Sequence, residues 1–183
     1  MSNRESWKKI AGSAKELAYM ATFTALLIAS QLVLSAIPGV ELVTVLCVAY
    51  AYVFGFRRGM VVATVFSVLR QLVFGFFPVV LILYLVYFNL LTFLFGKLGE
   101  RKKWKLFWVV LFACCCTLFF HVFDNILTPV WYGYTWEVTK KYVLVSVPVM
   151  ISQTVCTAVS VSVLFLPLTK IFTRLKGNVS KRR

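Results

Sequence analysis

The sequence predicts an all-α membrane protein with six transmembrane helices and both termini in the cytoplasm. Hydrophobic residues make up 61% of the 183 residues and charged residues only 14%, whereas soluble domains carry about 45–50% apolar and about 25% charged residues. Long runs contain no Asp, Glu, Lys or Arg, the clearest being Leu17–Val40, Gln71–Gly96 and Tyr142–Thr169. The 20 Lys and Arg residues outnumber the 6 Asp and Glu residues, and most of these charges lie between or outside the apolar runs.

Proline and glycine divide the apolar runs into six spans, most of them close to the roughly 17–25 residues that a membrane-spanning helix needs. The breaks fall at Pro38-Gly39, at 55–59 and at 75–78, because glycine favours helix ends and proline favours helix starts. The expected spans are Leu17–Ile37, Val40–Phe56, Gly59–Gly75, Pro78–Gly96, Leu106–Thr128 and Tyr142–Phe172. We expect tight connections at these three breaks and longer loops at 97–105 and 129–141.

The basic residues predict the orientation of these spans. With six spans both termini lie on one side, and that side carries 17 of the 20 basic residues. The opposite side carries Lys140 and Lys141, and Arg70 lies inside the third span. Since basic loops stay in the cytoplasm, we expect a multi-pass protein of the bacterial cytoplasmic membrane. Its parts are a basic N-terminal segment (1–16), a six-helix domain (17–172) and a basic cytoplasmic tail (173–183).

Several function classes are disfavoured by what the sequence lacks. The basic residues bracket membrane spans, so we read them against the lipid bilayer and expect no nucleic-acid partner. The sequence contains no phosphate-binding loop, no zinc-protease motif and no nucleophile elbow. The five cysteines all lie in apolar spans without histidines at ligand spacing, which indicates packing residues rather than a metal site. We therefore expect no enzyme activity and no cofactor.

Arg70 is a candidate binding residue because it lies deep in the third span. Its position is roughly 16 Å from the cytoplasmic end of that span, past the bilayer centre. An arginine at this depth costs at least about 2.5–3.5 kcal/mol and normally faces the bundle interior or a wet cavity. Two interpretations are open: a structural ion pair or a side chain that snorkels to the outer surface, and an anion-binding residue in a pocket.

A second group of candidates lies on the fifth span near its outer end. His121, Asp124 and Asn125 share one helix face, because residues three and four apart are neighbours. These side chains either cap and bridge helices or line a pocket. Acid–base catalysis by His121 and Asp124 is disfavoured, since no nucleophile or oxyanion hole accompanies them.

Two further polar residues complete the candidate pocket. Glu41 opens the second span, where a carboxylate also complements the helix dipole. Gln153 lies inside the sixth span, where a buried amide needs partners. Because Glu41, Arg70, His121 and Asp124 all fall in the outer half of the membrane, we expect them to converge on a cavity that opens to the outside.

The segment 129–136 carries four aromatic residues. They are Trp131, Tyr132, Tyr134 and Trp136. Tryptophan and tyrosine prefer the membrane interface, so an aromatic belt is one interpretation. The other is a lid, with Trp131 stacking on a planar ligand.

The first span carries a stripe of alanines. Ala11, Ala14, Ala18, Ala21, Ala25 and Ala29 recur at intervals of three and four residues. Small residues let helix backbones approach closely in lipid. The stripe either packs inside the protein's own bundle or docks to another membrane subunit.

Three short segments, together with this stripe and the six spans, carry a family resemblance. The segments are AIPGVELVT at 36–44, YVFGFRRG at 52–59 and LFLPL at 164–168. With them the chain resembles the substrate-binding S component of energy-coupling factor (ECF) transporters over most of its length.

The resemblance implies a subunit that binds a vitamin or related small molecule in an outward-facing pocket. It also implies association with a transmembrane T subunit and two ATPase subunits, with Ala21, Ala25 and Ala29 matching the surface that meets the T subunit. No substrate signature of the thiamine, biotin or riboflavin type matches residue by residue, so the substrate stays open.

Two other classes compete with this interpretation. A structural membrane protein of the rod-shape-determining MreD type is also small and polytopic, but it needs no ligand pocket, so Arg70 and the His121 face argue against it. An intramembrane enzyme ranks third.

Overall fold

The computed structural model describes residues 14–37, 42–101 and 105–180, which form six helices and no strand. The helices are α2 (Ala14–Leu34), α3 (Val43–Phe54), α4 (Phe56–Phe74), α5 (Pro78–Arg101), α6 (Leu106–Tyr132) and α7 (Trp136–Ser180). The prediction of an all-α chain with six helical segments is confirmed. Four of the six, namely α2, α5, α6 and α7, are long and apolar enough to cross a membrane, so a multi-pass membrane protein is confirmed at this coarser level.

Helices α3 and α4 correspond to the two predicted spans that are not both long and apolar enough to cross a membrane. Helix α3 has 12 residues, which gives a length of roughly 18 Å against a hydrocarbon core of about 30 Å. Helix α4 is long enough, with 19 residues, but carries Arg57, Arg58 and Arg70. The number of complete crossings and the cytoplasmic location of the termini therefore stay predictions.

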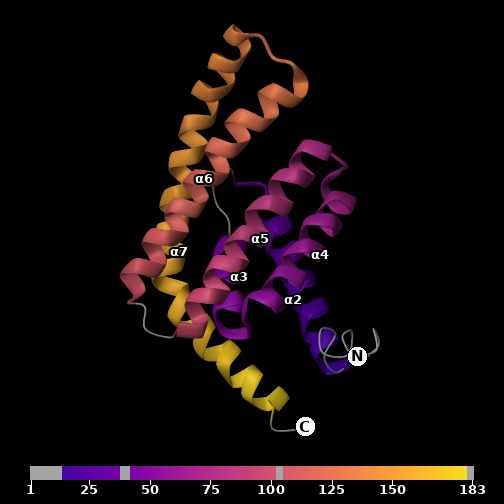
Figure 1. Ribbon diagram of the computed structural model, residues 1–183, viewed down its shortest axis with the longest axis vertical. Helices are drawn as coiled ribbons and strands as arrows, with labels where there is room; N and C mark the ends of the chain where they lie inside the picture. The colour runs from indigo at the N-terminus through magenta and orange to yellow at the C-terminus, as the bar shows by residue number, and fades with distance from the viewer. Residues whose placement is uncertain (1–13, 38–41, 102–104, 181–183) are drawn as a thin grey trace, which may run out of the picture.

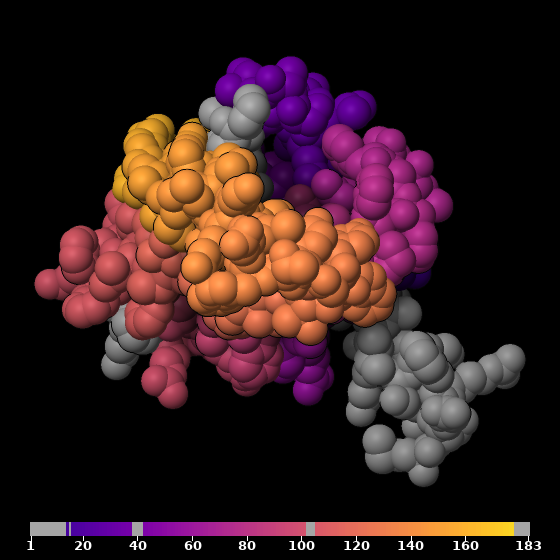
Figure 2. Space-filling model, turned by 90° about the horizontal axis from the view of Figure 1, so that it is seen from above, coloured from indigo at the N-terminus to yellow at the C-terminus, as the bar shows by residue number. Residues whose placement is uncertain are grey.

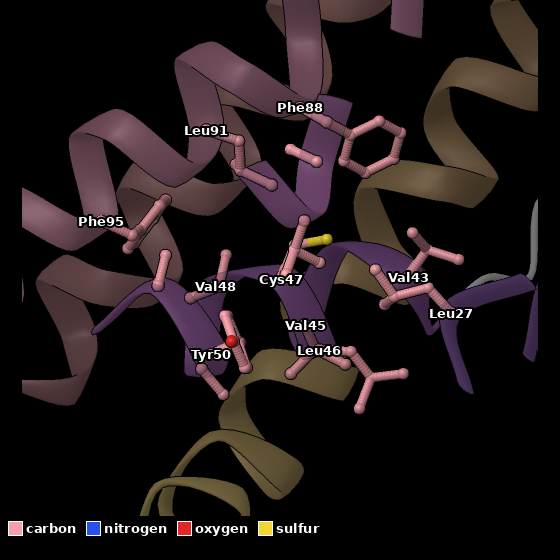
Figure 3. Close-up of a cluster of buried hydrophobic side chains, with 14 of the residues drawn as sticks. Leu27, Val43, Val45, Leu46, Cys47, Val48, Tyr50, Phe88, Leu91 and Phe95 are labelled. Atoms are coloured by element: carbon pink, nitrogen blue, oxygen red, sulfur yellow. The ribbon is translucent and has the colours of Figure 1, made fainter. Parts of the chain in front are cut away.

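Helix α3 lies at the centre of the bundle. Every residue from Val43 to Ala51 is buried, and α3 packs on α2, α4, α5 and α7. A helix that is apolar on all sides is typical of a protein core or a membrane span, and here the neighbouring helices form its surroundings. Figure 3 shows part of this core, to which α5 contributes Phe88, Leu91 and Phe95.

Two glycines of α5 permit its close approach to the end of α3 and the start of α4. A Cβ atom on Gly99 would lie 2.0 Å from the Tyr52 carbonyl oxygen, and a Cβ on Gly96 would lie 2.3 Å from the Phe56 Cα. Since both neighbours are backbone atoms, neither position has room for a side chain. A single residue, Gly55 with φ of 90°, joins α3 to α4.

The molecule has two ends that matter for function (Figure 1). At the first, which we call the basic end, α2 begins, α3 turns into α4, and α5 and α7 finish; it carries Arg57, Arg58, Lys97, Lys170 and Arg174. At the other, which we call the opposite end, lie the α4–α5 turn and the α6–α7 turn. The α6–α7 hairpin extends beyond the α4–α5 turn there (Figure 1).

The predicted loop at 129–141 is wrong. Helix α6 continues to Tyr132 and α7 begins at Trp136, so the connection is a short turn around Gly133, which has φ of 63°. Pro129 falls in the last turn of α6, where the Tyr134 N–H donates to the Pro129 carbonyl at 2.9 Å and closes the helix end. The predicted loop at 97–105 is also too long, because α5 continues to Arg101.

Candidate functional site

Helices α2, α4 and α5 bring three polar side chains together near the opposite end. The Gln31 Nε2 group donates a hydrogen bond of 2.9 Å to the Tyr84 hydroxyl. The Arg70 guanidinium carbon lies 4.3 Å from the centre of the Tyr84 ring and 4.9 Å from that of Phe74. Arg70 therefore faces two aromatic rings, one of them on the neighbouring helix α5, in the cation–π geometry that stabilises arginine at low dielectric.

Asp124 is held by hydroxyl groups instead of by a cation. Its two carboxylate oxygens accept hydrogen bonds from the Thr128 Oγ1 atom at 2.6 Å and from the Tyr142 hydroxyl at 2.9 Å. Tyr142 belongs to α7, so Asp124 joins α6 to α7. In the described part of the chain no carboxylate lies within ion-pair distance of Arg70. Glu41, the other carboxylate expected near Arg70, lies outside the described residues.

His121 and Gln153 meet at the α6–α7 interface. The His121 side chain is buried, with 6% of its surface exposed. The Gln153 side chain lies close enough to His121 for a side-chain hydrogen-bond interaction. Gln153 also lines a small cavity of about 20 Å³ with Tyr84, Tyr87 and Thr117. A volume of this size holds about one water molecule.

A chain of hydroxyl groups crosses the bundle beside this cavity. Thr44 on α3 lies 3.3 Å from the Tyr87 hydroxyl on α5, which lies 3.4 Å from the Thr117 hydroxyl on α6. Thr117 in turn lies 3.1 Å from the Thr157 hydroxyl on α7. Four helices are thus joined by buried polar contacts next to Gln153, and sequence reasoning identified none of these four hydroxyl residues.

Five buried side-chain atoms have no hydrogen-bond partner among the described residues. They are Gln31 Oε1, Arg70 Nε, Gln71 Nε2, His121 Nε2 and Asn125 Oδ1. Native proteins satisfy the great majority of such atoms, so a group of unsatisfied ones points to a ligand or to ordered water. Their helices place them toward the opposite end, since Gln31 lies late in α2 and Arg70 and Gln71 lie late in α4.

Three of these five residues were predicted from the sequence, namely Arg70, His121 and Asn125. Gln31 and Gln71 were missed, although each is an amide within an apolar run, the same signal that identified Gln153. Seen from the opposite end, the surface is hollowed between α2, the α4–α5 turn and α7 (Figure 2).

Trp131 occupies the last turn of α6 and is 51% exposed. It lies ten residues beyond His121, or roughly 15 Å along the helix. Neighbouring aromatic groups pair with one another: Tyr132 stacks on Tyr134 with ring centres 5.9 Å apart, and the Lys140 ammonium lies 5.0 Å from the Trp136 ring centre. These residues form an exposed aromatic tip on the α6–α7 hairpin.

The alanine stripe points away from the bundle. Ala21, Ala25 and Ala29 are all exposed, whereas the buried side of α2 consists of Met20, Phe23, Thr24 and Leu27.

A family model described as "ECF-type riboflavin transporter, S component" matches residues 11–172. No curated protein and no solved structure matches the chain. The family match runs from before α2 to the last turns of α7, so it takes in the predicted six-helix domain. The chain therefore belongs to the S-component family of ECF-type riboflavin transporters, which are substrate-binding subunits of membrane transporters and not enzymes.

Proposed function

We propose that this protein captures riboflavin, or a flavin with the same ring system, at the end opposite the basic residues. The family match over residues 11–172 carries this proposal. It also narrows the substrate class, which sequence reasoning left open among vitamin-like molecules.

The chemistry of the described residues supports a flavin. Riboflavin has a flat aromatic ring system, one edge with alternating N–H and C=O groups, and a chain of hydroxyls. A site for it needs aromatic surface and a few placed donors and acceptors. The Tyr84 and Phe120 rings, 6.0 Å apart, supply aromatic surface, and the unpaired atoms of Arg70, Asn125 and Gln31 supply donors and acceptors.

The other predicted pocket residues take supporting places in this proposal. His121, Asp124 and Gln153 form the α6–α7 wall, and Glu41 adds a carboxylate before α3. Trp131 acts as a lid that closes over the bound ring system. The α6–α7 hairpin, which joins Trp131 to this wall, is the element that supports such a role.

Docking follows capture. We place the exposed alanine stripe of α2 against a transmembrane T subunit that carries two ATPase subunits, in the cell membrane with both termini in the cytoplasm. The exposure of Ala21, Ala25 and Ala29 supports this, because a stripe that packed the protein's own bundle would be buried.

Titration with riboflavin tests the proposed substrate. Stacking on tyrosine or tryptophan quenches flavin fluorescence, so the purified full chain in detergent should quench it saturably with one site per protein. Thiamine, added in excess, should not compete. A protein that melts cooperatively but leaves riboflavin fluorescence unchanged would refute the flavin assignment, and mass spectrometry of co-purified small molecules would then identify the substrate class.

A further inference from the structure

A groove of about 700 Å³ lies at the basic end, away from the proposed flavin site. Its walls are the end of α3 with Tyr52 and Gly55, the end of α5 with Gly99, and the last turns of α7. In Figure 1 the yellow end of α7 passes below α3 and α5. The Lys176 ammonium group of α7 donates to the Val53 carbonyl at the end of α3, so a hydrogen bond joins these two walls.

The α7 wall of the groove presents two cations without a carboxylate partner. Lys170 and Arg174 line the groove, and within the described ranges no Asp or Glu lies within ion-pair distance of either. The carboxylate of Glu100 also lines the groove, but it pairs with Lys97 at 3.4 Å. The groove therefore has an excess of positive charge, which favours an anionic ligand.

The two threonine hydroxyl groups in the groove donate within α7. The Thr169 hydroxyl donates to the Leu166 carbonyl at 2.9 Å, and the Thr173 hydroxyl donates to the Thr169 carbonyl at 2.7 Å. Both threonine protons are used within α7, and the Lys176 ammonium donates to the Val53 carbonyl. Lys170 and Arg174 are the groove cations that have neither an ion pair nor a hydrogen bond of this kind among the described residues.

The surface of α7 changes from apolar to cationic along one face. Val163 and Leu166 lie about one to three turns before Lys170 and Arg174, at intervals of three and four residues that place them on the same side of the helix. Val163 is 62% exposed and Leu166 is 49% exposed. An apolar strip that leads into a pair of cations fits a molecule with an acyl chain at one end and a phosphate at the other.

We infer that this groove binds the phosphate headgroup of an anionic phospholipid, with Lys170 and Arg174 on the phosphate and an acyl chain along Val163 and Leu166. Basic pockets between helices at the cytoplasmic side of a membrane are suited to such headgroups. This assignment does not depend on the identity of the transported substrate. A soluble phosphate or an acidic protein segment would offer the groove the same negative charge. Only the phospholipid also has an acyl chain, which distinguishes it from them.

Native mass spectrometry of the full chain in detergent tests the lipid site. The protein is incubated with equal amounts of dioleoylphosphatidylglycerol and dioleoylphosphatidylcholine, and bound lipid is counted. We expect at least a tenfold preference for the anionic lipid. The double variant Lys170→Gln/Arg174→Gln should lower its occupancy at least tenfold, whereas Arg57→Gln/Lys105→Gln, which removes the same charge from the basic end outside this groove, should change it less than twofold.

A charge-preserving variant and a soluble competitor complete the test. Lys170→Arg/Arg174→Lys keeps both charges and should keep the preference, which separates loss of charge from loss of folding. Glycerol 3-phosphate carries the phosphate without an acyl chain, and it should not displace the lipid at concentrations far above that of the lipid.

Equal loss in the two Gln variants, or displacement by glycerol 3-phosphate, would overturn the assignment. So would a Gln variant that keeps its lipid but no longer co-purifies with the T subunit. Riboflavin titration of the Lys170→Gln/Arg174→Gln variant should give the wild-type affinity, so a failure here is distinct from a failure of the proposed function.

Discussion

A buried donor or acceptor without a hydrogen bond costs about 1–3 kcal/mol, and five such atoms lie in the described part of this protein. A ligand that satisfies several of them recovers that free energy on binding. The unpaired atoms therefore make the folded protein less stable than it would be with apolar residues there, and they provide a source of ligand affinity.

Replacement of Arg70, the arginine among these five residues, tests whether the unpaired atoms contribute to ligand affinity. Arg70→Ala should lower riboflavin affinity at least tenfold, because a tenfold change corresponds to about 1.4 kcal/mol and a desolvated charged contact is worth more. Arg70→Lys should restore only part of the loss, because lysine lacks the planar guanidinium that lies over the Tyr84 ring. Fluorescence titration in detergent measures the affinity.

The control for Arg70 is Arg57→Ala, which removes an exposed arginine at the basic end and should leave affinity unchanged. Wild-type affinity in a cooperatively melting Arg70→Ala protein would remove Arg70 from the flavin site and leave it as a structural residue.

Asn125 and Asn89 form a matched pair of asparagines. Asn125 has a buried, unpaired Oδ1 atom, whereas Asn89 donates to the Leu85 carbonyl at 2.8 Å and accepts from the Thr64 hydroxyl at 3.1 Å. Asn125→Leu should lower riboflavin affinity at least fivefold and raise or preserve the melting temperature, since it removes an unsatisfied group. Asn89→Leu should lower the melting temperature and preserve affinity. The opposite pattern in titrations and thermal melts would show that Asn125 is structural.

The candidate site could be predicted from the sequence only in part, for reasons visible in single residues. Arg70 and His121 stand out because charged or titratable residues are rare in apolar spans. Gln31 and Gln71 are weaker signals, and the hydroxyl chain through Thr44 and Tyr87 is weaker still, because threonine and tyrosine are common in such spans. Only the packing of four helices shows that these hydroxyls meet.

At the scale of secondary-structure elements, α5 depends on its two glycines. A Cβ on Gly99 would lie 2.0 Å from a backbone oxygen of α3, so Gly99→Ala must push α5 away from Tyr52. Overpacking of this kind typically costs about 1–3 kcal/mol. Gly177→Ala on α7 is the matched control, because no atom lies within 4 Å of its Cβ position. Thermal melts should show a clear decrease for Gly99→Ala and no decrease for Gly177→Ala; equal melts would mean that α5 has freedom to shift.

The outer face of α2 offers a second test at this scale. Ala25→Leu should weaken co-purification with the T subunit, because a bulky side chain forces the two backbones apart, and riboflavin binding by the isolated subunit should persist. Leu26→Phe adds bulk at an exposed position about 100° around the same helix and should leave co-purification intact. If Ala25→Leu instead abolishes riboflavin binding while the complex still assembles, the stripe serves the internal bundle.

The ends of the helices could be predicted where glycine or proline interrupts an apolar run. Gly55 and the segment 75–78 mark real breaks because glycine adopts positive φ at both turns, 90° at Gly55 and 98° at Gly75. The predicted end of the fifth span at Thr128 is four residues short of the end of α6. Pro129 lies in this extension, because proline near the end of a helix removes one backbone hydrogen bond and need not end the helix. The long α7 also continues through Pro148 and Pro167, which lie in its interior. In membrane helices, neighbouring helices and local adjustments satisfy the backbone groups that such prolines leave free.

At the scale of the whole molecule, the family match decides between the two classes that the sequence left in competition. A rod-shape-determining protein is not supported, and a transporter subunit is. The distribution of basic residues predicts the orientation of the protein in the membrane, and an experiment on intact cells tests that prediction.

Cysteine labelling tests the orientation. On a background without the native cysteines, Tyr134→Cys should react with an impermeant maleimide added from outside the cell, and Lys102→Cys should react only after the membrane is opened. The physical reason is the retention of basic loops in the cytoplasm. The reverse pattern would invert the topology and place the hairpin tip inside.

The enclosure of α3 has a consequence for biosynthesis. A 12-residue helix is too short to span the bilayer alone, and the walls that bury it include α5 and α7. These walls are translated after α3, and α7 is translated after α6. A nascent chain that has produced only α2 to α4 therefore holds α3 without two of the four helices that pack on it. We therefore expect the centre of the bundle to be completed only when α7 arrives, with lipid or the insertion machinery covering α3 until then.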